Sequence, residues 1–586
     1  MPHATVPSPG LQALILCGPG VSLNTFTSNP KDLPKALIPI ANRPMVWYPL
    51  DWCHRMGIND ITLVTPPESS EAVAAALKTH PALTGLRFKP DVLAPEELLQ
   101  TTGTGELLRL PEVQKAITSD FILLPCDLIS ELDGSSILQQ WMTLNPPSTS
   151  GKKLRWKGGL SVFYPTQGLE GVSTKKDETD FLATVPLPKS AVPPPHGSLR
   201  PHIEEIVTFM PTDTLNDKLE EDKGHLRVRQ SLLNRHGRVK MRMKHRDAHV
   251  YIFPQWVKEF VAKNERFDSV SEDVLGWWAK AGWQEGLAEK LGLDEVLGEK
   301  KAEDDEMNGD LADDEEIDPS SLSSTKAAKP VQQAATTASF ASRVGGTSAP
   351  TPKDRIATPP LLAYVQPAPS PSSPLQPLIR RVDTTAQLAS ISLYLARQPA
   401  DHPLAHEHNV HPTASIGLQS RISQEDSLVG HNVTMGIRCN VKESVIGANC
   451  EIGSNVRLTK CVLMEGVQVG DGVVMTGCII GRRARIQGVK AAPVEPAAAA
   501  QGAGGEGGES AAAAGDKKGK KKKGGAADDG EEERTRLTDC EVAPNYVVEA
   551  GTEAKGEKLM AFDTEGVVDE DMHDGEEDEQ GVEEED

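Results

Sequence analysis

The chain has 586 residues, of which 38% are hydrophobic, so it is long enough to form roughly two or three domains with separate cores. Its formal net charge of -23 argues against binding nucleic acid over its whole surface, because neutralising phosphates requires a basic surface. The eight cysteines show no Cys-x-x-Cys pair, which argues against a disulfide scaffold or a zinc site. Because we find neither a signal peptide nor an apolar run of membrane-spanning length, we expect a soluble protein of the cytosol.

Residues 8–298 alternate short apolar runs with helix-like stretches. The runs "ALILCG", "DITLVT" and "FILLPCD" have the composition of buried strands. The stretch "PMVWYPLDWCHRMG" is typical of a helix that packs Trp47, Tyr48 and Trp52 in the core or at an interface. This alternation is typical of an α/β domain with a parallel sheet, and we predict such a domain over residues 8–298.

Small and polar residues follow two of these strands. Gly18 and Gly20 come after "ALILC", and Lys35 follows in "PKALIPI"; glycines let the backbone approach a phosphate, and an ammonium group balances its charge. Asp127 ends the strand "FILLPC", where open α/β sheets bind ligands and a carboxylate could hold Mg²⁺. A second small-residue loop stands at residues 101–109. These residues indicate a nucleotide site, but they are also consistent with an ordinary turn, a solvent-facing Lys35 and a turn cap at Asp127.

The composition changes after residue 298. Residues 299–358 are acidic and then rich in Ser, Ala and Thr, so they cannot bury enough apolar surface to offset the entropy lost on ordering. We predict a disordered linker here. Residues 359–408, which include a Pro-rich stretch, are predicted to be a connecting segment with a short ordered return.

Residues 409–564 carry an internal repeat, in which aliphatic residues recur about every six positions, often followed by Gly. This spacing predicts a parallel β-helix, because each short strand then turns one aliphatic side chain inward and stacked coils bury a continuous column. The predicted column contains Ile416, Ile422, Leu428, Val441, Ile446, Ile452, Leu458, Val469 and Ile480.

The repeat is interrupted at about residues 491–534, where we predict a disordered insertion followed by one further coil. Its "KKGKKKK" run is either a localisation or RNA-contact patch or a solvated loop whose charges offset the neighbouring acids. Residues 565–586 are predicted to form an acidic disordered tail.

In their order along the chain, these motifs resemble a sugar-phosphate nucleotidyltransferase domain joined to a left-handed β-helix. Two families share this plan: the sugar-nucleotide pyrophosphorylases, and the gamma and epsilon subunits of eIF2B, the guanine-nucleotide exchange factor for translation initiation factor eIF2. The stretches "LCGPGVSLNTFT", "LLPCDLIS", "NRPMVWYPLDW" and "RDAHVYIF" are most similar to the gamma type. The resemblance implies an α/β nucleotidyltransferase-like domain with a Rossmann-like mixed sheet, followed by a left-handed parallel β-helix of hexapeptide repeats.

The resemblance also implies how this chain departs from an active enzyme. Lys35 matches the lysine of the enzymes' P-K motif, and Asp127 matches their first metal carboxylate. The enzymes' G-G-x-G-T-R loop holds the triphosphate with its glycines and arginine, but here it is shorter and has Val21 and Ser22 at the Thr and Arg positions. Pro19 also removes a backbone donor from this loop.

Two further departures concern the sugar site and the second metal carboxylate. Asp247 and His249 replace the Asn and Gly of the N-x-G-x-Y motif, and a side chain at position 249 would crowd a sugar ring. We find no later W-x-D-x-G segment to supply a second carboxylate. We therefore expect no catalytic residues and no required cofactor. A residual site of Gly18, Gly20, Lys35 and Asp127 that binds GTP or Mg²⁺ weakly stays open.

A gamma-type resemblance implies a non-catalytic subunit. Such a subunit pairs with epsilon, assembles with the alpha, beta and delta subunits, and supports GDP/GTP exchange on eIF2 and its regulation by eIF2 phosphorylation. It implies neither a membrane nor a specific nucleic-acid partner. Two alternatives are an active mannose-1-phosphate guanylyltransferase and a β-helix acyltransferase, for which His431 at a "GHNV" corner is the candidate catalytic histidine.

Overall fold

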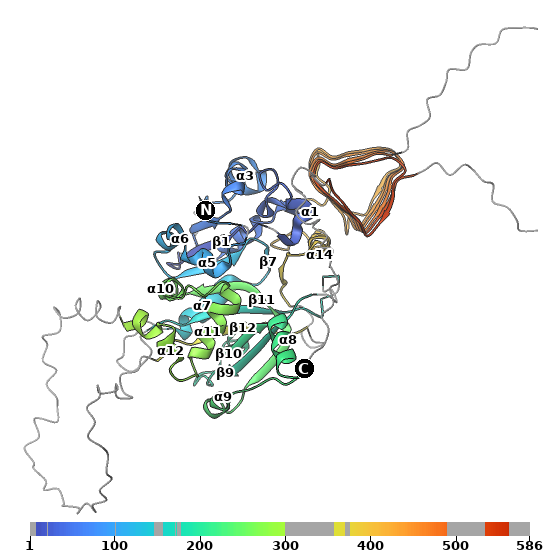
Figure 1. Ribbon diagram of the computed structural model, residues 1–586. Helices are drawn as coiled ribbons and strands as arrows, with labels where there is room; N and C mark the ends of the chain where they lie inside the picture. Colours follow the sequence, from blue (N-terminus) through green and yellow to red (C-terminus); the bar gives the residue numbers. More distant parts are fainter. Residues whose placement is uncertain are drawn as a thin grey trace, which may run out of the picture. The chain divides into compact units, whose positions relative to one another are not determined.

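The structure is a computed structural model with two compact units, Met1–Tyr394 and Leu395–Asp586, which we describe separately (Figure 1). The predicted linker, insertion and acidic tail lie almost entirely outside the described residues, as does Gly20. The described residues are 8–19, 21–99, 101–145, 156–169, 171–172, 177–298, 357–369, 376–488 and 534–561.

The first unit is built on a nine-stranded mixed sheet with the order β5-β4-β1-β6-β11-β8-β12-β10-β9. Strands β5, β4, β1 and β6 are parallel, whereas β11 runs antiparallel to both β6 and β8. The mixed α/β sheet that the resemblance implies is thereby confirmed, whereas the parallel sheet predicted from the alternation holds only for these four strands and for the pairing of β12 with β8. The strands are β1 (Gln12–Leu16), β4 (Asp60–Val64), β5 (Asp91–Leu93), β6 (Phe121–Pro125), β8 (Gly159–Pro165), β9 (Asp180–Pro186), β10 (Ile203–Pro211), β11 (Lys240–Phe253) and β12 (Leu361–Val365).

Local sequence explains where the helices begin. Helix α7 starts after Asp133, whose side chain accepts hydrogen bonds from the backbone N–H groups of Ser135 and Ser136, so it caps the helix. Helix α3 has a proline at its first position, where a missing N–H costs nothing. The helices are α1 (Asn24–Thr27), α2 (Trp47–Arg55), α3 (Pro67–Thr79), α4 (Pro81–Thr84), α5 (Thr104–Arg109), α6 (Pro111–Ala116), α7 (Gly134–Leu144), α8 (Thr212–Glu221), α9 (Gln230–Arg235), α10 (Trp256–Lys263), α11 (Leu275–Ala281), α12 (Leu287–Lys290) and α14 (Thr385–Ala396).

The core of this unit is rich in aromatic side chains. The rings of Trp256 and Trp278 meet edge to face with their centroids 4.8 Å apart, and both residues are almost completely buried. On α2, Tyr48 and Trp52 are buried as predicted, whereas Trp47 stays partly exposed with the Arg43 guanidinium 4.2 Å from its ring centroid.

The segment that follows residues 299–356 in the chain contributes to the centre of this sheet. Strand β12 lies between β8 and β10, parallel to β8, and all five of its residues are buried. The indole of Trp278 donates a hydrogen bond of 2.8 Å to the backbone oxygen of Pro359, just before this strand. The sequence predicts only a connecting segment here, because the run "LLAYV" is short and flanked by prolines.

Beyond β12 the chain returns to the carboxyl end of β6. Strand β13 (Ile379–Arg381) pairs antiparallel with β7 (Leu128–Ser130), which directly follows Asp127. Helix α14 comes next. A second small ribbon joins β2 (Pro39–Ile40) and β3 (Arg43–Pro44).

The second unit is a three-faced parallel β-helix, whose triangular outline is visible in Figure 1. Each face is a parallel sheet of six short strands. Equivalent positions in successive coils are 17 residues apart in most of the β-helix. For example, Ser444, just before β19, donates from its N–H to the hydroxyl of Ser427, just before β16. The first face is β14 (Ser415–Ile416), β17 (Thr434–Met435), β20 (Glu451–Ile452), β23 (Gln468–Val469), β26 (Arg485–Ile486) and β29 (Val547–Val548). The second is β15 (Arg421–Ile422), β18 (Asn440–Lys442), β21 (Arg457–Thr459), β24 (Val474–Thr476), β27 (Arg536–Thr538) and β30 (Glu553–Lys555), and the third is β16 (Leu428–Val429), β19 (Val445–Ile446), β22 (Val462–Leu463), β25 (Ile479–Ile480), β28 (Glu541–Val542) and β31 (Lys558–Leu559).

The predicted aliphatic column forms the interior of this β-helix. Its members from Val441 to Ile480 are buried in the β-helix core, whereas Ile422 is half-buried and Ile416 is 45% exposed. Leu428 is also buried, but the prediction is wrong by one residue there, because Val429 is the residue that stacks on the interior Ile446. Ile416 differs because β14 is the end strand of its sheet and has a neighbour on one side only. Beyond residues 489–533 the coils continue in register, since β27 pairs with β24 and β28 pairs with β25.

All eight cysteines are free and buried, five of them in the β-helix. Within the described part of the chain, no helix has the length and apolar character needed to cross a membrane.

Candidate functional site

The pairing of β1 with β6 brings two of the predicted site segments together. Leu16 lies opposite Pro125 in the parallel register, and the Cys126 N–H donates to the Leu16 oxygen at 3.0 Å. Gly18, in the loop after β1, and Asp127, two residues after β6, therefore leave the sheet at the same edge. This edge is where parallel α/β sheets place their ligand sites.

Lys35 and Asp127 form a buried ion pair at this edge. Lys35 opens a short 3-10 helix (Lys35–Leu37) after Pro34, and its ammonium nitrogen lies 2.7 Å from Oδ2 of Asp127. The side chain of Lys35 is only 13% exposed, so the alternative interpretation of Lys35 as a solvent-facing residue is wrong. Asp127 is completely buried, and its side chain meets cations rather than capping a turn.

A second cation reaches Asp127 from the part of the chain that follows residues 299–356. Arg381, the last residue of β13, places Nε 3.5 Å from Oδ1 of Asp127 and Nη2 3.9 Å from Oδ2 of Asp383. Asp383 in turn accepts from Nη2 of Arg246 at 2.6 Å, and Arg246 also contacts Glu178. The result is a chain of alternating charges along this edge.

His249 completes the surroundings of Arg381. Its Nε2 lies 3.1 Å from Nη1 of Arg381. Because a guanidinium can only donate, Nε2 accepts this bond and the imidazole is neutral. The backbone of His249 has φ of 52°, a left-handed conformation that favours glycine, and β11 shifts register between Asp247 and Tyr251. The glycine expected by resemblance thus has its backbone geometry here, but the site carries an imidazole.

Buried acids lie behind His249. Asp247 accepts hydrogen bonds from the Tyr251 hydroxyl at 2.6 Å and from the His249 N–H at 3.0 Å, and its own N–H donates to Asp180 at 2.7 Å. Burial raises the pKa of the Asp247 carboxyl to about 7 and that of Asp180 to about 6. These two carboxyl groups therefore take up protons near neutral pH.

The pKa values of Asp127 and Arg381 shift so as to favour the charged forms. Burial by itself would raise the pKa of Asp127, but the Lys35 ammonium and the Arg381 guanidinium hold that pKa well below its usual range. Burial would likewise lower the pKa of Arg381, but Asp127 and Asp383 raise it above its ordinary value. Each charge is thus stabilised by its neighbours in the pocket.

The glycine loops do not contribute equally. Gly18 is exposed, and a methyl group added to it would meet no atom within 4 Å; Val21, which replaces a polar residue of the enzyme loop, is 67% exposed. In the second loop, a Cβ at Gly103 would lie 2.1 Å from the backbone oxygen of Asp268, and one at Gly105 would lie 2.4 Å from that of Phe267. The second loop therefore needs glycine for packing inside the unit, so its role as a phosphate loop is not supported.

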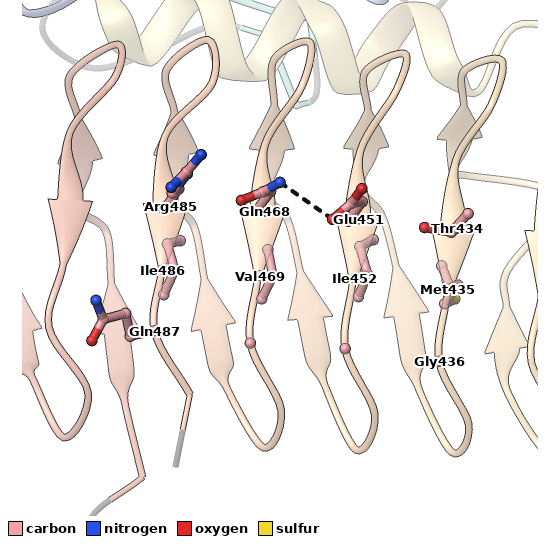
Figure 2. A pocket seen from close by; sticks show the side chains of 12 residues that line it. Thr434, Met435, Gly436, Glu451, Ile452, Gln468, Val469, Arg485, Ile486 and Gln487 are labelled. Carbon is pink, nitrogen blue, oxygen red and sulfur yellow. Dashed lines mark hydrogen bonds between the residues drawn. The ribbon is translucent and has the colours of Figure 1, made fainter. Parts of the chain in front are cut away.

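A separate groove of about 550 Å³ runs across the first face of the β-helix (Figure 2). Successive coils present one outward side chain each, and Nε2 of Gln468 donates to Oε2 of Glu451 at 3.2 Å. His431 lies at a turn and is not among the residues that line the groove. The lining residues are Thr434, Met435, Gly436, Glu451, Ile452, Gly453, Gln468, Val469, Gly470, Arg485, Ile486 and Gln487.

Comparison with known proteins finds similarity to subunits of eIF2B in both parts of the chain. The family model of the eIF2B subunit epsilon left-handed β-helix domain matches residues 407–497. The chain is 28% identical over 275 residues to translation initiation factor eIF2B subunit gamma of Schizosaccharomyces pombe, covering 47% of this chain and 52% of that protein. It is 26% identical over 135 residues to eIF2B subunit epsilon of the same organism, covering 23% of this chain and 19% of that protein.

The chain is similar to subunits of eIF2B. The resemblance to the gamma type that the motifs predict is confirmed, and so is the left-handed β-helix. The chain spans about half the length of the eIF2B gamma subunit that it matches.

The residues around Asp127 do not fit the Mg²⁺ ion that the nucleotidyltransferase resemblance implies. Both oxygens of Asp127 already face cations, Lys35 on one side and Arg381 on the other. Among the described residues, no group of three or more His, Cys, Asp or Glu side chains is arranged to hold a metal ion.

The sequence patterns did not identify Arg381 and Asp383 as members of the site, nor Arg246 as the partner of Asp383. The stretch "RVDTTAQ" carries a carboxylate at the same edge as Asp127, so the structure does supply a second acid although no W-x-D-x-G motif is present. The contact could not be predicted from the sequence because β13 pairs with a strand far earlier in the chain, and Arg381 and Asp127 are 254 residues apart.

Proposed function

We propose that this chain is a non-catalytic, gamma-type subunit of an eIF2B complex in the cytosol. It pairs with the epsilon subunit, assembles with the alpha, beta and delta subunits, and supports GDP/GTP exchange on eIF2 and its regulation by eIF2 phosphorylation. The observation that carries the proposal is the similarity to the eIF2B gamma subunit over 275 residues. The match of residues 407–497 to the epsilon β-helix model supports the same assignment.

The pocket at the edge of the sheet supports the non-catalytic part of the proposal. A nucleotidyltransferase needs cationic groups that are free to stabilise the charge developing on the phosphates. Here the Lys35 ammonium is bound to Asp127, and the loop after β1 offers Val21 and Ser22 in place of a threonine and an arginine. An active mannose-1-phosphate guanylyltransferase is therefore disfavoured.

The β-helix supports the proposed role in assembly. Its faces are flat parallel sheets, and its first two coils leave Ile416, Leu418 and Ile437 exposed. Exposed apolar side chains beside an end strand that is paired on one side only are surfaces that a partner protein can cover.

A reconstitution experiment tests the proposal. The full chain is expressed alone and together with the epsilon subunit of its own organism, and each preparation is assayed for GDP release from eIF2 and for GDP-mannose formation from GTP and mannose-1-phosphate. We expect a stable pair with epsilon, faster GDP release with the pair than with epsilon alone, and no sugar nucleotide from this chain. GDP-mannose formation by a chain that does not bind epsilon would overturn the proposal.

A further inference from the structure

Three groups that normally bind metal ions converge on a single side chain in the first unit. The guanidinium of Arg381 lies 3.5 Å from a carboxylate oxygen of Asp127, 3.9 Å from one of Asp383 and 3.1 Å from Nε2 of His249. These contacts use three different nitrogen atoms of the guanidinium, so the three groups surround it. The Arg381 side chain is 14% exposed, and that of Asp127 is 1% exposed.

Two carboxylates and an imidazole nitrogen form a set of donors that suits divalent cations such as Mn²⁺. The lone pair of His249 Nε2 points to Arg381 and is not protonated, which is the form that a metal would need. The guanidinium donates hydrogen bonds to Asp127 and His249 and forms an ion pair with Asp383, and its single charge spreads over a plane wide enough to reach all three groups.

The neighbouring charges are already balanced without a metal. Lys35, Arg381 and Arg246 supply three positive charges, and Asp127, Asp383 and Glu178 supply three negative charges, each in contact with a cation of this set. The carboxylates of Asp247 and Asp180 lie behind His249, and each already accepts at least one hydrogen bond. A divalent ion added to this arrangement would bring two further positive charges to buried carboxylates that are already paired with cations, which is unfavourable.

We propose that Arg381 is an internal cation that occupies the place of a divalent metal ion and closes this pocket to metal and to metal-bound nucleotide. The same contacts hold β13, and with it the chain that follows residues 299–356, against the carboxyl end of β6. These side chains therefore form a structural ion cluster, in which Arg381 from a distant segment stabilises the buried acceptors as a metal ion would. This inference does not depend on the proposed subunit role.

Mn²⁺ binding to the purified full chain tests the inference. Mn²⁺ is titrated by calorimetry and by electron paramagnetic resonance into the wild type, Asp127→Asn, Arg381→Met, the double variant Arg381→Met/Asp127→Asn, and Arg242→Met. Arg242→Met is the matched control, because Arg242 also pairs with a carboxylate, Glu204 at 2.8 Å, but makes no contact with Asp127.

We expect the wild type and Asp127→Asn to be indistinguishable in Mn²⁺ binding, since the wild-type pocket is closed. Arg381→Met is expected to bind Mn²⁺ at least about tenfold more tightly than the wild type. This gain should disappear in the double variant and be absent in Arg242→Met. Mn²⁺ should also raise the unfolding temperature of Arg381→Met but not that of the wild type.

Two results would overturn the inference. One is Mn²⁺ binding by the wild type that Asp127→Asn abolishes, because the pocket would then be open. The other is a folded Arg381→Met protein with no gain in Mn²⁺ affinity, because the guanidinium would then not stand in for a metal. The wild-type comparison decides the matter even if Arg381→Met does not fold.

Discussion

The two units of this chain differ in how far apart along the sequence their contacts are made. In the β-helix, each strand pairs with strands about one coil away, so Val445 lies opposite Val462 and Val462 lies opposite Ile479. In the α/β unit, the ion cluster joins Lys35, Asp127 and Arg381, and β12 enters the sheet between β8 and β10 from beyond residues 299–356. A repeat can thus be read locally, whereas the cluster exists only after the chain has folded.

This difference implies that a substitution destabilises the two units in different ways. A stacked repeat depends on each coil burying its inward side chain against the next coil. The α/β unit instead depends on single long-range contacts that fasten distant segments. Substitutions that separate these two kinds of dependence are considered below, from the largest expected effect to the smallest.

The largest effect is expected from Leu458→Asp in β21. Leu458 is completely buried in the β-helix, and an unpaired carboxylate at that position should cost at least about 5 kcal/mol of stability. The matched control is Arg457→Asp, which introduces the same side chain one residue earlier, on the exposed face of the same strand. Chemical denaturation with limited proteolysis should show a destabilised β-helix in the first variant only. Equal stability of the two variants would contradict the inward register of Leu458.

The next largest effect is expected from Asp127→Asn. The substitution leaves the Lys35 ammonium and the Arg381 guanidinium without their shared counter-ion, and breaking a buried ion pair typically costs about 3 to 5 kcal/mol. Asp133→Asn is the control, because Asp133 is only the exposed cap of α7 and asparagine caps a helix as well as aspartate does. The two free energies of unfolding are compared at pH 7, and a loss below about 1 kcal/mol for Asp127→Asn would contradict a buried cluster.

The sequence correctly predicted the features that depend on residues close together in the chain. The six-residue period identifies the β-helix because inward and corner positions repeat, and the apolar runs identify β1, β4 and β6. It also singled out Lys35 and Asp127, although not their contact. Arg381 could not be found in the same way, because it follows a Pro-rich stretch and its partners are set by the pairing of β13 with β7.

The phosphate-loop prediction at residues 101–109 shows the reverse limitation. A glycine in a loop can serve a ligand or a neighbouring backbone, and the sequence does not distinguish the two. The structure does so at Gly103, where the backbone oxygen of Asp268 occupies the space of a side chain. At His249 a glycine-like backbone carries an imidazole, so even the residue type misleads unless its contacts are known.

A third prediction concerns pH and the buried acids behind His249. Because burial raises the pKa of Asp247 from an ordinary 3.8 to about 7, the unfolded chain binds fewer protons between these values. The stability contributed by this carboxyl is therefore complete below pH 4 and is lost as the pH rises through 7, by roughly 2 to 3 kcal/mol between pH 5 and pH 8. Asp180, whose pKa is raised to about 6, adds a loss of the same sign.

Asp247→Asn should remove much of this dependence. Asparagine keeps an oxygen that can accept a hydrogen bond from the Tyr251 hydroxyl. The hydrogen bond that the backbone N–H of residue 247 donates to Asp180 is unchanged. The free energy of unfolding of the first unit is measured at pH 5 and pH 8 in both proteins. A wild-type stability that rises from pH 5 to pH 8 would show that this carboxyl is already ionised in the folded state.

The smallest effect is expected at a corner of the β-helix. Lys460 follows β21 with φ of 56°, and Gly477 follows β24, in the next coil, with φ of 69°. Because a left-handed backbone costs a non-glycine residue roughly 1 kcal/mol or more, Lys460→Gly should raise stability, although glycine also loses more entropy on folding. We expect a net gain of about 0.5 kcal/mol. The control is Lys442→Gly within the exposed face of β18, where glycine has no such benefit and should lower stability by about 0.5 to 1 kcal/mol. Opposite signs for two lysine-to-glycine changes would show that the corners carry backbone strain, which the hydrophobic period of the repeat does not reveal. Losses of equal size would mean that the corner conformation costs lysine nothing.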